Sequence, residues 1–264
     1  MFGWKRRPRP VALVPFAETP PRLFNTLLCD GVTAKNLPSF AELLALHDRL
    51  QTERPGRRVL ASLDDLGQAA YTPAHGTEAH RLDDVVADDP ADSLPPHPGY
   101  PGTPDDFPVR LANLLRGAVD LEAVRGLLWW ETSGDANDLV TINRDPEAAL
   151  RIAHEAEVIF QFVPVATAAD AIAAFPNGYF NSDLNPFQTH ALARYLEAEH
   201  GLALFGIGSR FLGFRRAVPL SAAEAQRLAA ALCGLYAHTP EDAVAALAVL
   251  LTGRDWLLFR YTES

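Results

Sequence analysis

The chain has 264 residues, of which 48% are hydrophobic and 21% are charged. This balance is typical of a globular protein with a sizeable core, and it excludes a mainly disordered chain, a collagen-like repeat and a disulfide-framework miniprotein. The formal net charge of −10 repels phosphate backbones, so we expect no nucleic-acid partner.

Two further features of the composition bear on location. No apolar run approaches the roughly 18 residues that a membrane span needs, so we expect no integral membrane segment. Cys29 and Cys233 are the only cysteines and lie far apart, which favours a reducing compartment over a disulfide scaffold. Alanine and arginine are abundant, while Lys5 and Lys35 are the only lysines. We therefore expect a cytoplasmic bacterial protein.

The first 72 residues predict a short tail and a small unit. Residues 1–10 form a basic tail with four cations and no acid. Residues 11–72 predict a small N-terminal α/β unit, with strands at 11–16 and 58–63. Thr19 followed by Pro20 favours a helix that ends near Cys29, because proline is tolerated at a first helical position. Ser39 and Glu42 have capping-box spacing and predict a second helix.

Residues 73–108 combine eight of the 21 prolines with many aspartates. Low hydrophobicity and like charges disfavour a packed segment, because little buried surface is available to offset the entropy of ordering. This stretch predicts an acidic, proline-rich linker or a long surface loop.

Residues 109–264 predict a C-terminal α+β domain. Its helix starts are marked by Asp145-Pro146, Thr167, Asn185-Pro186, the capping box of Ser221 and Glu224, and Thr239-Pro240. The predicted strands are residues 127–131, 139–143, 158–165, 202–208, 211–216 and 254–261, and the predicted helices are 146–157, a short one after Thr167, 186–201, 222–236 and 240–251.

These elements repeat an order of strand, strand, helix and strand, at 127–165 and again at 202–262, where the second copy has an extra helix before its last strand. The order predicts an α+β fold with a mixed, mostly antiparallel sheet and helices on one face. It also suggests two related strand-strand-helix-strand units from a distant internal duplication, beside the small N-terminal α/β unit.

Part of the C-terminal domain has features of a known family. They are Asn181, a helix ending in Glu199-His200-Gly201-Leu202, a strand-turn-strand around Gly208, Pro219 before an alanine-rich helix, and a terminal segment with Trp256. On these features residues 181–262 resemble the bacterial family called domain of unknown function 4253. The chain departs from the family near Glu197, where an aromatic residue is expected, and in its ending at residues 259–261. The resemblance implies no known activity.

The strongest candidate for a reactive or binding site is the polar segment just before the helix that follows Asn185, together with the first turn of that helix. A helix N-terminus offers free N–H groups that favour an anion. His190 can titrate near neutral pH, and Asp183 can orient it for general base catalysis. Asn181, Asp183, Asn185 and His190 are therefore the ligand-binding candidates, with Asp183 and His190 as catalytic candidates. The alternative is that Asn185 and Asp183 only cap the helix and stabilise the turn.

A second candidate is a divalent metal site at His75, His80 and Asp83, since two imidazoles and nearby carboxylates are possible ligands. The spacing does not match the helical H-E-x-x-H pattern, and a solvated acidic loop is the alternative. The glycines around Gly208 predict a hairpin turn, because a dinucleotide fingerprint would lead into a helix.

The sequence thus lacks a convergent set of reactive residues. It favours a non-catalytic protein-interaction or regulatory module with a protein partner and no cofactor. The alternative is an enzyme or small-anion-binding protein that uses the cluster near residue 186. An open pocket lined by those side chains would favour the alternative, and an exposed apolar patch would favour the module.

Overall fold

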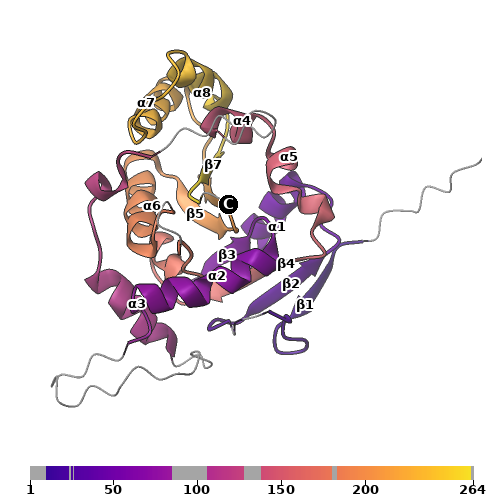
Figure 1. The fold of residues 1–264 in the computed structure, drawn as a ribbon. Coiled ribbons are helices and arrows are strands. Elements are labelled where there is room, and N and C mark those ends of the chain that lie inside the picture. The colour runs from indigo at the N-terminus through magenta and orange to yellow at the C-terminus, as the bar shows by residue number, and fades with distance from the viewer. Residues whose placement is uncertain are drawn as a thin grey trace, which may run out of the picture.

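The computed structural model describes residues 10–23, 25, 27–84, 106–127, 138–179 and 183–262. These residues form one seven-stranded mixed sheet with helices around it, as Figure 1 shows. The predicted α+β class with a mostly antiparallel sheet is confirmed.

The strands come from both ends of the chain. They are β1 (Ala12–Pro15), β2 (Gly31–Lys35), β3 (Arg58–Ser62), β4 (Glu157–Val163), β5 (Ala203–Ile207), β6 (Phe211–Arg215) and β7 (Trp256–Arg260). Their order in the sheet is β1-β2-β4-β3-β5-β6-β7, and all neighbouring pairs are antiparallel except β3 and β5. Because β4 lies between β2 and β3, the predicted N-terminal unit and C-terminal domain share one sheet.

The helices fill the connections between these strands. They are α1 (Phe40–Glu53), α2 (Leu66–Ala79), α3 (Phe107–Arg116), α4 (Leu139–Arg144), α5 (Pro146–Leu150), α6 (Pro186–His200), α7 (Ala222–Cys233) and α8 (Ala243–Leu251), with 3-10 turns η3 (Leu121–Val124), η4 (Ile152–His154) and η5 (Ala169–Ala174). None of the helices in the described ranges combines the length and the apolar run that crossing a bilayer requires.

Both faces of the sheet are covered, so the expectation of helices on one face is wrong. Trp256 of β7 packs edge-on against Phe40 of α1, with ring centroids 5.0 Å apart. Phe259 lies three residues later in the same strand and therefore points to the opposite face. Its ring is 6.2 Å from that of Tyr236, which follows α7. Six consecutive residues of β4, residues 158–163, are buried, as a strand covered on both sides requires.

The predicted starts of several helices are confirmed, and in each case the predicted capping residue makes the expected hydrogen bonds. The Ser39 side chain accepts a hydrogen bond from the Glu42 amide at the start of α1. Asn185 with Gln188, and Ser221 with Glu224, form complete capping boxes at α6 and α7. The hairpin of β5 and β6 also forms where it was expected.

Other predicted elements are wrong. Between Thr19 and Gly31 none of the described residues is helical, and residues 31–35 form β2, a strand that the sequence did not predict. Residues 73–79 belong to helix α2 and not to a linker, while residues 85–105 of that predicted linker lie outside the described residues. Residues 139–143 are helical, so the first of the two proposed repeat units does not form. The helix expected at 146–157 ends at Leu150, where Arg151 adopts a left-handed conformation.

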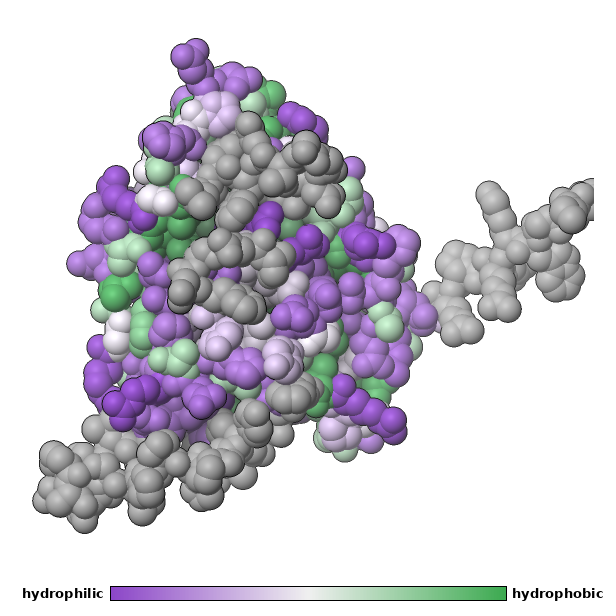
Figure 2. Space-filling model, in the orientation of Figure 1, coloured by the Kyte–Doolittle hydropathy of each residue, from purple (hydrophilic) through white to green (hydrophobic). Residues whose placement is uncertain are grey.

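The core lies between the sheet and these helices. Its largest fully buried side chains include five phenylalanines, all on strands: Phe160, Phe205, Phe211, Phe214 and Phe259. Full burial of one such ring stabilises a fold by roughly 2–3 kcal/mol. Figure 2 shows that the outer face in this view is mostly hydrophilic, with hydrophobic residues in separate groups.

Asn143 of α4 covers the outer edge of β7. Its amide nitrogen donates to the Leu258 carbonyl at 2.9 Å, and its amide oxygen accepts from the Leu258 amide at 2.9 Å. The same nitrogen donates to the Leu139 carbonyl, and the side chain is completely buried. The amide of Asn143 thus takes the place of a neighbouring strand at this residue.

We expect Asn143→Ala to lower the free energy of unfolding by about 2–4 kcal/mol, because it leaves both polar groups of Leu258 buried and unpaired. Arg144→Ala, which changes the next and exposed side chain, should cost less than about 0.5 kcal/mol. Urea unfolding of both variants measures the difference. Equal midpoints would show that the Leu258 bonds do not stabilise the fold.

Candidate functional site

The polar groups at the start of α6 bond to one another. The side-chain oxygen of Asn185 accepts from the amides of Phe187 and Gln188, both at 3.0 Å. The Gln188 side chain in turn accepts from the Asn185 amide at 3.0 Å. The N–H groups that would bind an anion are therefore already bonded within the chain, and Asn185 serves as the cap of the helix.

His190 is buried one turn further into α6, with 1% of its surface exposed. Its Nε2 lies 2.9 Å from Oδ1 of Asp170 on η5. The sequence predicted Asp183 as the residue that orients the imidazole. In the structure the carboxylate that contacts the imidazole belongs to Asp170 instead. Asp183 itself is buried beside Tyr261, whose pKa is raised by burial and further by the charges of Asp64 and Asp183. Asn181 lies outside the described residues.

The hydrogen bonds of His190 indicate which nitrogen carries the proton. Nε2–H can donate to the Asp170 carboxylate, whereas Nδ1 is buried and has no hydrogen-bond partner among the described residues. A proton on Nε2 fits this environment, because an N–H at Nδ1 would be left unpaired. The hydrogen bond from His190 lowers the pKa of Asp170, against the opposing effect of burial. The pair can hold a proton, but the ring does not reach solvent.

The proposed metal ligands do not form one site. His75 on α2 packs between two tyrosine rings, with centroid distances of 4.8 Å to Tyr71 and 5.0 Å to Tyr179. His80 packs against the Phe187 ring at 5.8 Å. Asp83 accepts two hydrogen bonds from Arg110, at 2.7 and 2.9 Å. Within the described part of the chain, no group of three or more His, Cys, Asp or Glu residues is arranged to hold a metal ion.

The structure brings together a polar cluster that the sequence analysis missed. Asp64 follows β3, and Ser209 and Arg210 follow β5, so all three lie at the carboxyl ends of the two parallel strands. Oδ2 of Asp64 accepts from Ser209 Oγ at 2.8 Å and from Arg210 Nε at 3.1 Å. A Cβ at Gly208 would overlap Oδ1 of Asp64, so this approach requires glycine. The residue types after each strand were visible in the sequence, but their parallel pairing was not.

Burial dominates the electrostatics of this cluster. Asp64 is 3% exposed, and burial raises the pKa of its carboxyl, while Arg210 and Ser209 act in the opposite direction. The Arg210 guanidinium also donates to the Ala149 carbonyl and lies over the Phe211 ring. Both partners of Asp64 are thus used within the fold, and the cluster holds the turn between β5 and β6 against the end of β3.

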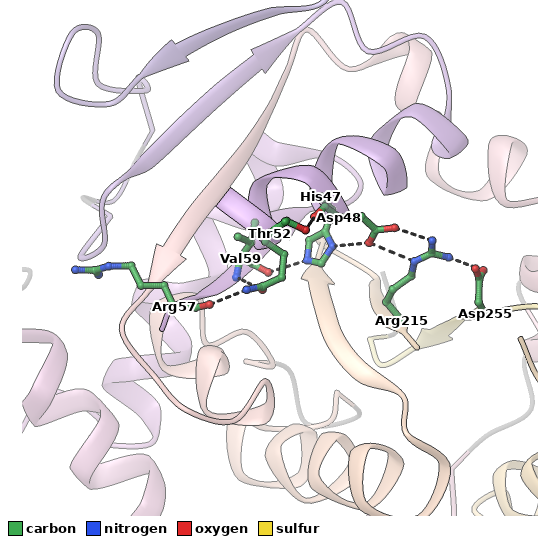
Figure 3. Close-up of polar contacts among 8 residues, drawn as sticks. His47, Asp48, Thr52, Arg57, Val59, Arg215 and Asp255 are labelled. Atoms are coloured by element: carbon green, nitrogen blue, oxygen red, sulfur yellow. Dashed lines mark hydrogen bonds and ion pairs between the residues drawn. The ribbon is translucent and has the colours of Figure 1, made fainter. Parts of the chain in front are cut away.

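A third polar network joins α1 to the far half of the sheet, as Figure 3 shows. Nε2 of His47 lies 3.0 Å from the Val59 carbonyl, and Nδ1 lies 3.4 Å from Oδ1 of Asp48. Arg215 at the end of β6 bonds to Asp48 at 2.7 Å and pairs with Asp255 before β7. Burial would raise the pKa of Asp48, but hydrogen bonds from His47 and Arg215 lower it to about 2.

Comparison with models of protein families, with curated proteins and with solved structures finds no match to this chain.

We expect the Asp170 carboxylate to stabilise the fold in a pH-dependent way. Its pKa is lower in the folded chain than in the unfolded one, so its contribution is present above about pH 4 and is lost as the pH falls through the folded-state pKa. Asp170→Asn should therefore lower the free energy of unfolding by about 1–2 kcal/mol at pH 7, with a smaller difference at pH 3. Asp120→Asn, at an exposed position, is the control and should leave the free energy of unfolding unchanged at both pH values. A pH-independent difference for Asp170→Asn would contradict this assignment.

Removing Arg210 should leave the buried Asp64 charge uncompensated. We expect Arg210→Gln to cost roughly 3–5 kcal/mol of unfolding free energy at pH 7. Because burial favours the protonated carboxyl, the cost should fall as the pH is lowered towards 4. Arg125→Gln, which breaks an exposed ion pair with Glu122, is the control and should leave the free energy of unfolding nearly unchanged at either pH. Denaturant unfolding at the two pH values checks both expectations.

Proposed function

We propose that this chain is a non-catalytic protein-interaction or regulatory module of the bacterial cytoplasm. The observation that carries the proposal is helix α8, a nine-residue helix of sequence AVAALAVLL without a single polar side chain. A helix that is hydrophobic all round is normally buried on all sides. Here one side faces solvent, with Val249 76% exposed.

The inner side of α8 is already used within the fold. Ala243, Leu247, Ala248 and Leu251 are buried, and the helix packs against α7 and α4. Figure 1 places α7 and α8 together at the periphery of the molecule, at the top of the view. Ala245 and Val249 are exposed and lie one turn apart, so they share the outer side. We call Ala245, Val249 and Thr252 the outer stripe of α8.

The apolar surface extends beyond the helix. Val218 is 64% exposed, and the Leu220 carbonyl accepts from the Gly253 amide at the end of α8. This places the segment of Val218 beside the end of the outer stripe. Scattered exposed valines need no explanation, but exposed apolar side chains of α8 with Val218 beside them favour a protein contact.

The residues that were candidates for catalysis or ligand binding also favour a non-catalytic module. Asn185 caps α6, and His190 is buried against Asp170. Cys29 and Cys233 are free and buried, and burial raises their pKa values to about 12 and about 11, which disfavours the reactive thiolate. Free buried thiols also fit a reducing compartment.

One observation favours the alternative, an enzyme or small-anion-binding protein. Nδ1 of His190 is buried without a hydrogen-bond partner among the described residues, and a buried polar atom in this state is a candidate for ligand contact. In this alternative His190 and Asp183, with Asn181 and Asn185, would bind the ligand. The resemblance of residues 181–262 to domain of unknown function 4253 stays a prediction under either function.

The interaction function predicts contacts that depend on the outer stripe. We expect in-cell crosslinking of the native chain, read by mass spectrometry, to give protein contacts that Val249→Arg removes. Leu115→Arg, at an apolar residue of α3 that is 46% exposed, is the matched control and should retain these contacts, as should His190→Gln. Crosslinks that are identical in all variants would contradict the module. A metabolite that raises the melting temperature of the wild type but not of His190→Gln would favour the alternative.

A further inference from the structure

We propose that the sheet consists of two halves that separate along the pairing of β3 with β5, in a motion that is sensitive to ionic strength. The first half is β1, β2, β4 and β3, and the second half is β5, β6 and β7. We call the pairing of β3 with β5 the seam. The motion takes place within one chain and does not use the outer stripe of α8, so it is independent of the proposed function.

The seam is the shortest pairing in the sheet. β3 and β5 are joined at only two registered pairs, Ala61 with Gly206 and Ser62 with Ile207. Every other neighbouring pair of strands has four or five registered pairs. Among the described strands the seam is also the one parallel pairing, and parallel strands pair slightly less stably per residue than antiparallel ones. The backbone therefore joins the two halves less strongly than it joins the strands within either half.

Two ion pairs cross the seam, one at each end of β3. Arg58, the first residue of β3, lies 3.9 Å from Glu197 on α6, the helix that leads into β5. Asp64, just after β3, lies 3.1 Å from Arg210 in the turn that follows β5. The side chains of Arg58, Glu197 and Arg210 are 35%, 29% and 31% exposed. Dissolved salt therefore weakens both attractions, and it weakens the Arg58 pair more because both of its side chains reach solvent.

A third ion pair joins the second half to α1, which moves with β3. Nε2 of His47 and the side-chain oxygen of Gln51 both bond to the backbone of Val59 in β3, each at 3.0 Å. These bonds attach α1 to the first half. Asp48 of α1 bonds to Arg215 of β6 at 2.7 Å, and its side chain is 45% exposed (Figure 3). This link is therefore also weakened by salt.

The apolar contacts across the seam are concentrated on one ring. Phe205 of β5 packs against the rings of Phe40 and His47 on α1, with centroid distances of 6.4 and 5.4 Å. The turn η5 contacts β3, β4 and β5, but four of its six residues are alanine. An alanine side chain buries little apolar area, so its exposure costs little free energy. The closed form therefore depends on the Phe205 contacts and on the three ion pairs.

Each half keeps its own helices when the seam opens. In the first half α1 stays bonded to Val59 of β3. In the second half α7 packs on α8, α8 packs on α4, and Asn143 of α4 bonds to Leu258 of β7. Native proteins open in cooperative units of this kind at a lower free energy than complete unfolding requires. We therefore expect the seam to open while both halves remain folded.

Native-state hydrogen exchange, read by NMR on the full-length chain, tests this motion. The amides of Ser209 and Arg210 bond to Asp64 across the seam, at 3.3 and 3.4 Å, so they report on its opening. Raising the salt concentration from about 0.01 M to about 1 M shortens the Debye length from about 30 Å to about 3 Å. These two amides and those of β5 should then exchange roughly threefold faster or more. The amides that pair β2 with β4, and β6 with β7, should change little.

A matched pair of variants separates the seam from general electrostatics. Asp48→Asn removes one ion pair across the seam, and it should speed exchange of the same amides at low salt by roughly twofold or more. Glu157→Gln is the control, because the exposed pair of Lys35 with Glu157 joins β2 to β4 within the first half. It should leave the seam amides unchanged. Salt that speeds exchange in all strands equally or in none, or an Asp48→Asn variant that behaves as Glu157→Gln does, would overturn the proposal.

Discussion

The sheet depends on the buried carboxylate of Asp64 where its two halves meet. β3 and β5 pair in parallel through only two registered residue pairs, and among the described strands this short seam is the one pairing that joins the β1-β2-β4-β3 half to the β5-β6-β7 half. Ser209 and Arg210 bond to Asp64 at one end of the seam. α1 spans it, since His47 of α1 bonds to the Val59 carbonyl of β3 and packs its ring against Phe205 of β5. The ion pair of Asp48 with Arg215 adds a second link across it.

Local signals in the sequence predict the parts of the fold that depend on neighbouring residues. Capping boxes place α1, α6 and α7, and the glycine-containing turn places the hairpin of β5 and β6. Residues 139–142 are mostly apolar, and three of the four are β-branched, which favours a strand. The structure is helical there because Asp138 caps the amides of Val140 and Thr141.

Contacts between distant residues explain what the sequence could not predict. Pro73 lacks the N–H that would bond to the Ala69 carbonyl, so it argued against a helix. That carbonyl accepts instead from Asn177, 108 residues later, and α2 continues through the proline. The partner of His190 is a similar case. Asp183 is near it in sequence, but the packing of η5 on α6 brings Asp170 to the imidazole.

The two borders of the sheet have a consequence for how this molecule can associate. Strand addition needs a row of open backbone groups along an edge. At β7 an incoming strand would have to displace the Asn143 amide from Leu258, and at β1 it would meet Pro15, which has no N–H to donate. Growth of the sheet from one molecule into the next, the route to fibrous aggregates, is therefore disfavoured at both borders. Contacts between molecules are left to side-chain packing on the helices.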